Sequence, residues 1–357
     1  MKTAAITMLS GCIFGLFLLN CGSPPAAESA KVEVGEWTDT NFPSYIRRVT
    51  HFGERPDWSP DGKRILFLEK TYGDVYEVDL ETGVIRLLTH HYYHNGYTRA
   101  LYLSNGDIIL SGSRTFDPER HSDARHKTAE LWVLSKSLDK PPVPLGEFCS
   151  EGPAVSRKNL KIAWAAGHSQ YPDKLPEGAS QMWVAEIDYS TGEPKLANKK
   201  LVLDNRKLDF KANLEAQNFV LPDETKLTLS GYGFQGTEVM MLDLATGQVT
   251  NMSNAPGQYD EPEGIFPDGK FTLVECDKHT GPDFKGSKHI DLYKLALDGS
   301  GDTQRLTYFN AGGVYKASNP VVSDDGRFIA FQVPKSEMIA GVGLGIYILD
   351  LQAAGLR

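Results

Sequence analysis

The sequence lacks any run of basic residues. It holds 37 Lys and Arg against 46 Asp and Glu, which gives a formal net charge of −9 over 357 residues. A protein that binds nucleic acid normally presents a concentrated basic surface, because neutralising the phosphates supplies much of the affinity. The composition therefore argues against nucleic acid as a partner.

Cysteine is scarce, with four residues in the chain. Cys12 and Cys21 lie in the N-terminal stretch, which leaves Cys149 and Cys276 as the one pair that could form a disulfide in the body of the protein. An oxidising compartment permits such a bond. Both residues fall on expected loops of one face, but in non-adjacent repeats. The sequence leaves open whether they form a disulfide or stay as two partly buried thiols.

A long hydrophobic run is missing as well. The mostly apolar stretch from Ala4 to Leu19 is too short for a comfortable membrane span, and it follows the basic Lys2 as in a secretory signal. Leu18-Leu19-Asn20-Cys21-Gly22 resembles a bacterial lipobox. We therefore predict a lipoprotein signal peptide over residues 1–20, a lipidated Cys21 and a flexible tether over residues 21–43. The alternative is an ordinary signal peptide cut slightly later.

This pattern predicts a protein of the bacterial cell envelope. A lipid on Cys21 would hold it on the periplasmic side of the outer membrane or outside that membrane, and the contact with the membrane would be through the anchor alone. We expect a monomer.

Motifs of several enzyme classes are also absent. The chain has no Ser-centred nucleophile elbow and no Gly-rich phosphate loop. It offers no tight metal-ligand spacing, since the nearest cluster, His90-His91-x-x-His94, falls in an expected loop rather than on a helix. Sequence motifs alone do not decide whether the protein is an enzyme.

What the sequence does contain is a repeat. Trp58-Ser59-Pro60-Asp61-Gly62 places a hydrophobic residue before a tight turn, in which Pro60 sets φ and Asp61-Gly62 supplies the left-handed positions. A strand is expected directly afterwards. Near copies are VVSDDGRFIAFQ (321–332) and IFPDGKFTLVE (265–275), and three degraded copies begin at residues 103, 155 and 220.

Each copy is followed by a strand that ends in a short turn, as in DVYEVDLETG (74–83) and EVMMLDLATG (238–247), and most copies by one more strand. The unit is thus four short strands, and it occurs six times, starting near residues 54, 99, 151, 216, 261 and 318. Four strands in about 40–50 residues are the signature of a propeller blade. We expect an all-β fold, a six-bladed β-propeller with four-stranded blades, as one domain over residues 44–357.

The sixth unit ends before its last strand. YIRRVTHF (45–52) matches TQRLTYF (303–309) and precedes the first unit. We predict that this N-terminal strand completes the sixth blade, because closing the ring in this way removes exposed sheet edges.

These motifs resemble the WD40-like repeat of the TolB-type six-bladed propellers. The resemblance rests on WSPDGK (58–63), VYEVDLETG (75–83) and LLT (87–89) and extends over the propeller region. It is specific for the fold and says little about function, since the family includes periplasmic translocation proteins, peptidase-associated propellers and some polysaccharide lyases with related blades. TolB itself carries a separate N-terminal α/β domain, for which this chain offers only a short linker, so a role in envelope translocation is not expected.

One face of the predicted propeller carries the long loops. The turns between strands one and two and between strands three and four are short, whereas four of the loops between strands two and three are long: 111–129, 165–180, 276–289 and 333–345. All nine histidines are expected on this long-loop face. Long loops on a rigid scaffold commonly carry function, and tolerated insertion is the alternative.

The residues just before each inner strand should ring the mouth of the central channel on that face. They are charged or amide side chains in every unit, and Glu275 adds a carboxylate in the fifth. Channel mouths are polar in any case because water fills them. Carboxylates, amides and tyrosines together suit oligosaccharides, however, because rings stack on sugars and polar groups fix their hydroxyls. The candidate ligand-binding residues are Arg99, Glu151, Glu215, Asn218, Glu261, Glu263, Lys316 and Asn319.

Three functions of different kinds remain open. The first is a binding module that holds a glycan, a peptide or a partner protein of the envelope on the long-loop face. The second is implied by the resemblance to the propeller lyases: a polysaccharide (uronate) lyase that uses a divalent metal, Ca, Mn or Mg, with ligands drawn from His94, His168, His279 and His289. The third is a structural scaffold for an envelope complex.

Overall fold

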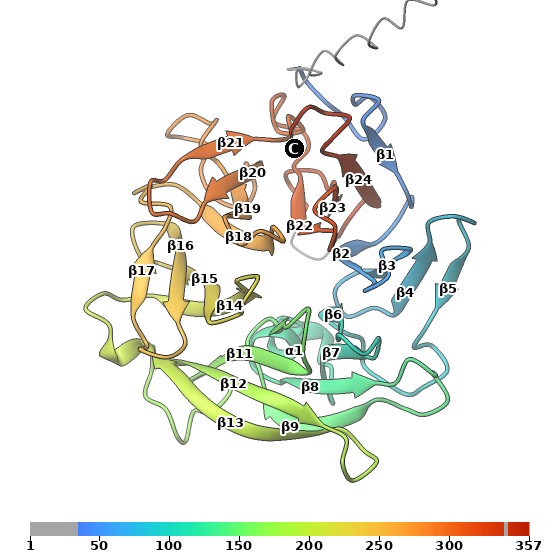
Figure 1. Ribbon diagram of the computed structural model, residues 1–357, viewed down its shortest axis with the longest axis vertical. Coiled ribbons are helices and arrows are strands. Elements are labelled where there is room, and N and C mark those ends of the chain that lie inside the picture. The colour runs from blue at the N-terminus through green and yellow to red at the C-terminus, as the bar shows by residue number, and fades with distance from the viewer. Residues whose placement is uncertain (1–34, 339–341, 357) are drawn as a thin grey trace, which may run out of the picture.

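The computed structural model describes residues 35–338 and 342–356. It contains six four-stranded antiparallel sheets arranged in a ring (Figure 1). The protein is a six-bladed β-propeller, as the repeat predicts. The residues described ahead of the first strand form no helix or strand.

In the first five blades the strands follow chain order from the centre of the ring outwards. Blade one has β2 (Glu54–Trp58), β3 (Arg64–Leu68), β4 (Val75–Asp79) and β5 (Ile85–Leu87). Blade two has β6 (Arg99–Tyr102), β7 (Ile108–Ser113), β8 (Ala129–Leu134) and β9 (Val143–Phe148). Blade three has β10 (Pro153–Val155), β11 (Lys161–Gly167), β12 (Ser180–Asp188) and β13 (Lys195–Asp204).

The remaining blades follow the same plan. Blade four has β14 (Asn213–Phe219), β15 (Lys226–Tyr232), β16 (Thr237–Asp243) and β17 (Val249–Asn251). Blade five has β18 (Asp260–Ile265), β19 (Phe271–Cys276), β20 (Asp291–Ala296) and β21 (Thr303–Arg305). Blade six has β22 (Ser318–Val322), β23 (Phe328–Gln332), β24 (Ile346–Asp350) and, as its outer strand, β1 (Ile46–Arg48).

The pairing of β1 with β24 confirms the predicted closure. Ile46 lies opposite Leu349, and Arg48 lies opposite Tyr347, in an antiparallel register. Because β1 comes from the start of the propeller and β24 from its end, both ends of the domain are held in one sheet. The described residues ahead of β1 also pack here: Trp37 is buried against Tyr45 and Phe309.

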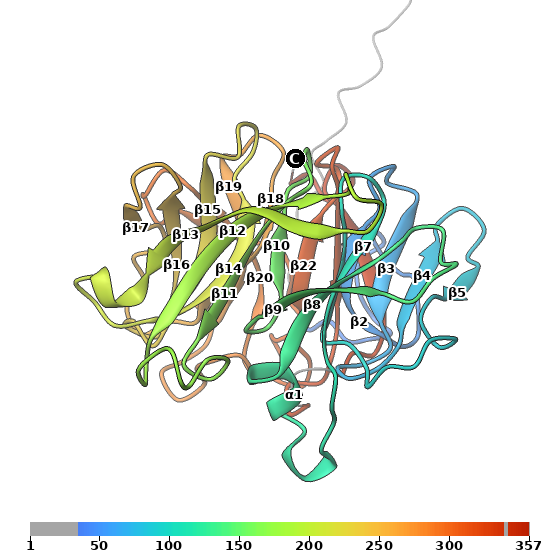
Figure 2. The same ribbon diagram turned by 90° about the horizontal axis from the view of Figure 1, so that it is seen from below.

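Helical structure is minor. The long β7–β8 loop holds a short 3₁₀ turn, η1 (Pro118–Arg120), and the helix α1 (Asp123–His126), and it projects from one face of the ring (Figure 2). A second 3₁₀ turn, η2 (Asn205–Lys207), follows β13. Among the described residues, no helix has the length and apolar character needed to cross a membrane.

The core lies between neighbouring blades. Trp58 and Phe67 of blade one, for example, belong to a buried cluster with Ala330 and Ile348 of blade six. Each blade therefore buries the side of the next, and the ring loses this packing wherever one sheet is incomplete.

A side-chain contact recurs within the blades and accounts for part of the sequence repeat. An acidic residue before or at the start of the third strand accepts a hydrogen bond from a hydroxyl group 15 or 16 residues later. Thr89 donates to Asp74 (2.6 Å), Ser253 donates to Glu238, and Thr307 donates to Asp291 (2.9 Å). The contact joins the third strand to the end of the fourth strand in each of these blades.

The two cysteines in the body of the protein are free. Cys149 and Cys276 are both buried, and they belong to different core clusters. Burial raises the pKa of both thiols, so they remain protonated and unreactive. Of the two alternatives left by the sequence, the structure has the pair of buried thiols.

Candidate functional site

A cavity of about 460 Å³, here called the chamber, lies at the mouth of the central channel on the long-loop face. All six blades contribute to its lining, either from the start of an inner strand or from a long loop such as the one that carries α1. It lies where the sequence places the mouth of the channel. Of the eight predicted ligand-binding residues, the chamber brings together Arg99, Glu151, Glu215, Glu261, Glu263, Lys316 and Asn319.

The eighth, Asn218, lines a smaller cavity of about 80 Å³ further along the channel. Arg99, Glu263 and Asn319 line both cavities, so these three side chains form the floor of the chamber. They are linked across the channel, since Arg99 lies 3.9 Å from Glu263, and the Asn319 amide donates to Glu263 at 3.0 Å. Arg99 also reaches Glu215 of blade four, at 3.5 Å.

Gly152 leaves room for this arginine. A Cβ atom at residue 152 would lie 2.9 Å from both Cβ and Cγ of Arg99, closer than carbon atoms can approach. The absence of a side chain at Gly152 therefore helps to place the guanidinium group across the channel.

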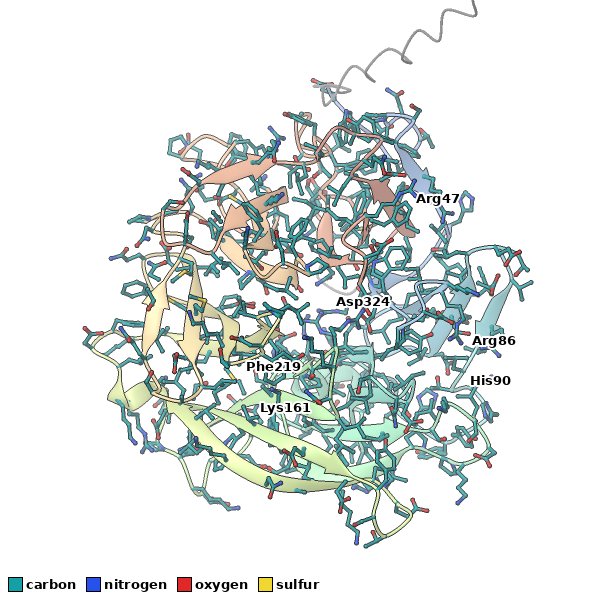
Figure 3. All side chains as sticks on the ribbon, viewed as in Figure 1. Arg47, Arg86, His90, Lys161, Phe219 and Asp324 are labelled. Atoms are coloured by element: carbon teal, nitrogen blue, oxygen red, sulfur yellow. The ribbon has the colours of Figure 1, made fainter. Side chains whose placement is uncertain are left out.

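At the short-turn end a second arginine crosses the channel. Arg157 of blade three donates to Asp324 of blade six at 2.9 Å and to Asp57 of blade one at 3.4 Å. All three residues line the smaller cavity, and Figure 3 shows Asp324 inside the ring, whereas Arg47 and Arg86 lie at its outer edge. This contact joins blades one, three and six at the short-turn end, and the chamber lies at the other end, on the long-loop face.

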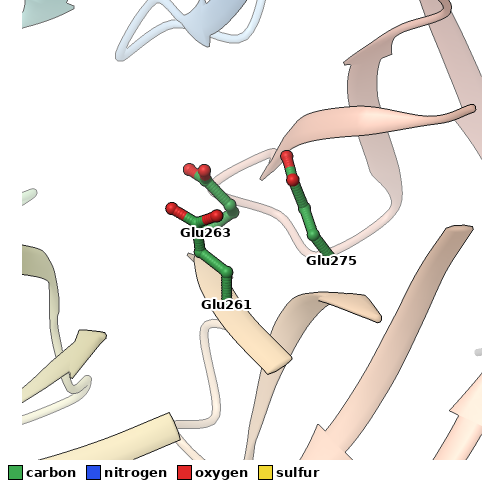
Figure 4. Close-up of side chains that lie close together, drawn as sticks. All are labelled: Glu261, Glu263 and Glu275. Carbon is green, nitrogen blue, oxygen red and sulfur yellow. The ribbon is translucent and has the colours of Figure 1, made fainter. Parts of the chain in front are cut away.

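Carboxylates dominate the wall formed by blade five. Carboxylate oxygens of Glu261, Glu263 and Glu275 lie within 4.8 Å of one another, and Figure 4 shows the three groups directed into the same space. The hydroxyl groups of Tyr232 and Tyr259 both contact Glu261. These tyrosines lie at the edge of the acidic cluster and hold one of its members in place.

Burial makes Glu263 and Glu275 hard to ionise. It raises the pKa of Glu263 to about 8, and the neighbouring Glu261 and Glu275 add to the shift against the opposing effect of Arg99. Burial and Glu261 likewise raise the pKa of Glu275 to about 8. The pKa of Glu215 is also raised, first by burial and then by Glu151 and Glu261. The wall therefore holds protons near neutral pH that a cation could replace.

The opposite wall is basic. Arg125, from α1, forms an ion pair with Glu151, whose other oxygen lies 3.1 Å from Nδ1 of His126. Although burial opposes ionisation, Arg125 and His126 hold the pKa of Glu151 well below its ordinary value. Arg55 lies beside them and is only 5% exposed, and its Nε atom has no hydrogen-bond partner.

Three residues that line the chamber have left-handed backbone conformations: Arg55 (φ 53°), Glu151 (φ 66°) and Asn319 (φ 47°). A non-glycine residue with positive φ costs free energy, and such residues concentrate at functional sites. Arg55 and Asn319 also coincide with β-bulges in β2 and β22, which turn their side chains into the channel.

The second strand of the preceding blade fixes each of these three residues. Gln332 accepts from the backbone N–H of Arg55 and Glu275 from that of Asn319, both at 2.6 Å. Ser111 donates to the carbonyl oxygen of Glu151 at 3.0 Å. The chamber lining is therefore held by contacts between blades and does not depend on one loop.

The four histidines predicted as metal ligands have separate partners. His94 accepts from the Gly96 N–H through Nδ1 and lies 3.0 Å from Asp74 through Nε2. Nδ1 of His168 lies 2.8 Å from the carbonyl oxygen of Leu175. His279 is held between Tyr293 and Asn310, and His289 packs against Phe284. In the described part of the chain, the residues close enough to share an ion are instead three glutamates: Glu261, Glu263 and Glu275.

Among the charged and tyrosine side chains of the chamber, the sequence did not single out Arg125, Tyr232 or Lys288, whereas His126 was expected on this face with the other histidines. Arg125 lies in a long loop whose sequence does not recur in the other repeats, so no repeat position pointed to it. Tyr232 ends β15 but does not correspond to Glu275, because Ser230 pairs with Glu215 as Glu275 pairs with Glu261. Comparing the repeats would therefore not have found Tyr232.

We predict that the raised pKa values of Glu263 and Glu275 make the protein less stable as the pH rises. Between the ordinary value near 4.5 and about 8, the folded state binds more protons than the unfolded state, so the free energy of unfolding falls across this window. From pH 6.5 to 8.5 the melting temperature should fall by at least about 3 °C. Asp260 and Asp291, with pKa values of about 6, have mostly titrated below this range.

The Glu275→Gln variant tests the origin of this slope by differential scanning calorimetry. The glutamine keeps the oxygen that accepts from Asn319 but cannot ionise, so the variant should be less sensitive to pH and more stable than the wild type at pH 8.5. Glu81→Gln, an exposed position on a short turn, is the control and should keep the wild-type slope. An unchanged slope in Glu275→Gln would show that this carboxyl group ionises normally.

Comparisons with known proteins show the fold. No family model and no curated protein matches the sequence. Among solved structures, a gluconolactonase from Xanthomonas campestris is 12% identical over 85% of this chain and 88% of its own, with a TM-score of 0.54. An oligogalacturonate lyase from Vibrio parahaemolyticus is 12% identical over 89% of this chain and 96% of its own, with a TM-score of 0.49.

A putative TolB from Agrobacterium tumefaciens is 14% identical over 86% of this chain and 84% of its own, with a TM-score of 0.38. The structural neighbours thus include TolB and other propellers, in agreement with the resemblance of the repeat. At such identities the likeness concerns the fold alone. The function has to be argued from the chamber.

Proposed function

We propose that this protein is a binding propeller of the bacterial envelope that holds a glycan or a peptide in the chamber. The observation that carries the proposal is the chamber itself: a cavity of about 460 Å³ to which all six blades contribute charged, amide or tyrosine side chains. Its volume is in the range of pockets that take small ligands. A partner protein would instead rest on the rim of the long-loop face, with one side chain or terminus in the chamber.

A structure that served only as a scaffold would not need this lining. Buried charges lower stability unless they are paired, and left-handed residues such as Arg55 add to that cost. The chamber gathers both features at one end of the channel. We take the accumulation of buried charge and backbone strain at one place as support for ligand binding there.

A thermal-shift screen with glycans and peptides tests the proposal. A ligand that raises the melting temperature of the wild type should fail to do so in Glu261→Gln, because this glutamate lies at the centre of the acidic wall. Glu81→Gln, on the short-turn face, should respond like the wild type. If Glu81→Gln loses the response and Glu261→Gln keeps it, the ligand binds to the opposite face.

A metal-dependent uronate lyase is the second candidate, and the cluster of Glu261, Glu263 and Glu275 favours it. Carboxylate oxygens at this spacing suit hard cations such as Ca²⁺, Mg²⁺ or Mn²⁺. A bound cation would neutralise the uronate carboxylate. The lyase is favoured over the binding propeller if one of these ions raises the melting temperature, EDTA reverses the effect and Glu263→Gln abolishes it. The protein should then also cleave an acidic polysaccharide.

The proposed anchoring rests on the lipobox-like sequence around Cys21, which lies outside the described residues. We predict that Cys21→Ser moves the protein from the membrane fraction to the soluble fraction, because the burial of the lipid chains supplies the attachment. Cys12→Ser is the matched control and should remain with the membrane. If Cys21→Ser stays in the membrane fraction, Cys21 does not carry the anchor.

A further inference from the structure

The charges of the chamber are separated between opposite walls. Arg55, Arg99 and Arg125 come from blades one and two, whereas Glu215, Glu261, Glu263 and Glu275 come from blades four and five. Blade two faces blade five across a six-bladed ring (Figure 1). The arginines therefore gather on one side of the chamber and most of its carboxyl groups on the other. Glu151 stands among the arginines, Arg99 reaches across to Glu215 and Glu263, and Lys288 and Lys316 line the chamber from blades five and six.

On the positive side, one guanidinium group is incompletely paired. Arg55 has carboxylates at 3.9 Å, from Glu54 and Glu151, but Nε makes no hydrogen bond although the residue is 95% buried (5% exposed). Glu151 is already engaged by Arg125 and His126. A buried arginine donor without an acceptor lowers stability, and a carboxylate in the chamber would supply that acceptor.

On the negative side, two carboxyl groups have no cation of their own. Among the described residues, Glu263 lies near Arg99, but no basic nitrogen lies within 4.0 Å of Glu261 or Glu275. Lys316 also lines the chamber, and its ammonium group donates to the carbonyl oxygen of Ser287 at 2.9 Å. These two carboxyl groups accept hydrogen bonds from neutral donors instead. The hydroxyl groups of Tyr232 and Tyr259 donate to Glu261, and the backbone N–H of Asn319 donates to Glu275.

A ligand with no charge would fit this chamber poorly. It would leave the Nε atom of Arg55 without an acceptor and would offer no cation to replace the protons of the crowded carboxyl groups, and a buried donor without an acceptor lowers stability. A simple cation would satisfy the acidic wall alone, and a simple anion the basic wall alone. A ligand that carries both charges at opposite ends satisfies both walls.

We infer that the chamber binds a compact zwitterion, a short peptide with free termini, whose carboxylate pairs with Arg55 and whose ammonium group lies among Glu261, Glu263 and Glu275. This inference rests on the proposed function and specifies the ligand of the same site. An ammonium group has three donors and suits several carboxylates at once, whereas the planar guanidinium group suits a carboxylate. A cavity of about 460 Å³ is large enough for a dipeptide.

The experiment compares free and blocked peptides on the unmodified protein by isothermal titration calorimetry. A library of unblocked dipeptides is first screened by thermal shift, and the strongest binder is then made with an acetylated amino terminus or an amidated carboxyl terminus. Each block removes one charge and leaves the rest of the ligand unchanged. We expect each block to weaken binding by at least about tenfold.

Two variants assign the ends of the ligand to the walls. Arg55→Gln should bind the free and the amidated peptide about equally, while it still discriminates against the acetylated peptide. Glu275→Gln should show the reverse pattern. Such selective loss of discrimination is not expected from general destabilisation, which would weaken the binding of every peptide alike.

The inference is overturned if no dipeptide of the library binds, or if blocked and free dipeptides bind equally well. If a neutral oligosaccharide binds in their place, and Glu261→Gln abolishes that binding, the proposed function stands and the zwitterion is wrong. If no probe of any class shows binding that depends on Glu261, the proposed function fails as well.

Discussion

A variant without residues 45–52 should show no cooperative thermal unfolding and should aggregate on purification. The deletion removes β1, so β24 loses its antiparallel partner and blade six exposes a free edge. It also removes Tyr45 and Ile46 from the core cluster of blade six. Since each blade packs on its neighbours, we expect the whole ring to be affected rather than one sheet.

Differential scanning calorimetry and size-exclusion chromatography measure this outcome. Arg47→Met is the matched control, because Arg47 lies in the middle of β1 but is exposed at the outer edge (Figure 3). The control should unfold cooperatively near the wild-type temperature. A deletion variant that is monomeric and melts like the wild type would show that β1 does not close the ring.

The second large effect is expected for Arg99→Met, which removes the cation from the floor of the chamber. Glu215 and Glu263 would then be buried without the guanidinium group that lies 3.5 and 3.9 Å from them. Breaking a buried ion pair from one side lowers stability by about 3–5 kcal/mol. At pH 8 we expect a loss of that size, together with the loss of ligand binding in the chamber.

The dependence of this loss on pH distinguishes an electrostatic cause from lost packing. At pH 5 both glutamates can take up protons at lower cost, so the difference in stability between Arg99→Met and the wild type should shrink. Denaturant unfolding at the two pH values measures it. An equal loss at pH 5 and pH 8 would mean that the aliphatic part of Arg99, and not its charge, supports the floor.

The repeat predicted the fold well because each copy carries its own turn chemistry. The inner strands β2, β6 and β22 begin at the predicted residues, Glu54, Arg99 and Ser318. The prediction was less accurate in blade three, where β10 begins at Pro153 and not at Glu151. Glu151 has a positive φ and lies two residues ahead of this strand, whereas the left-handed residues Arg55 and Asn319 lie within β2 and β22.

The repeats reveal only part of the site, because their alignment compares positions that recur in every blade. Alignment of the repeats points to residues at equivalent positions, such as Glu261 and Asn319, and these line the chamber. It contains no information about Arg125, which reaches the chamber from a long loop in which no position repeats between the blades. Nor does it show that the Nε atom of Arg55 lacks an acceptor, since that depends on which neighbour Glu151 engages across the blades.

The position of a bound ligand is the most direct test of the account. A crystal structure of the protein soaked with the strongest binder from the screen would show it. The account predicts ligand density in the chamber, in contact with Arg55 on one side and Glu261 or Glu275 on the other. Density at the short-turn end beside Arg157, or on the outer surface of the blades with the chamber filled by water, would contradict it.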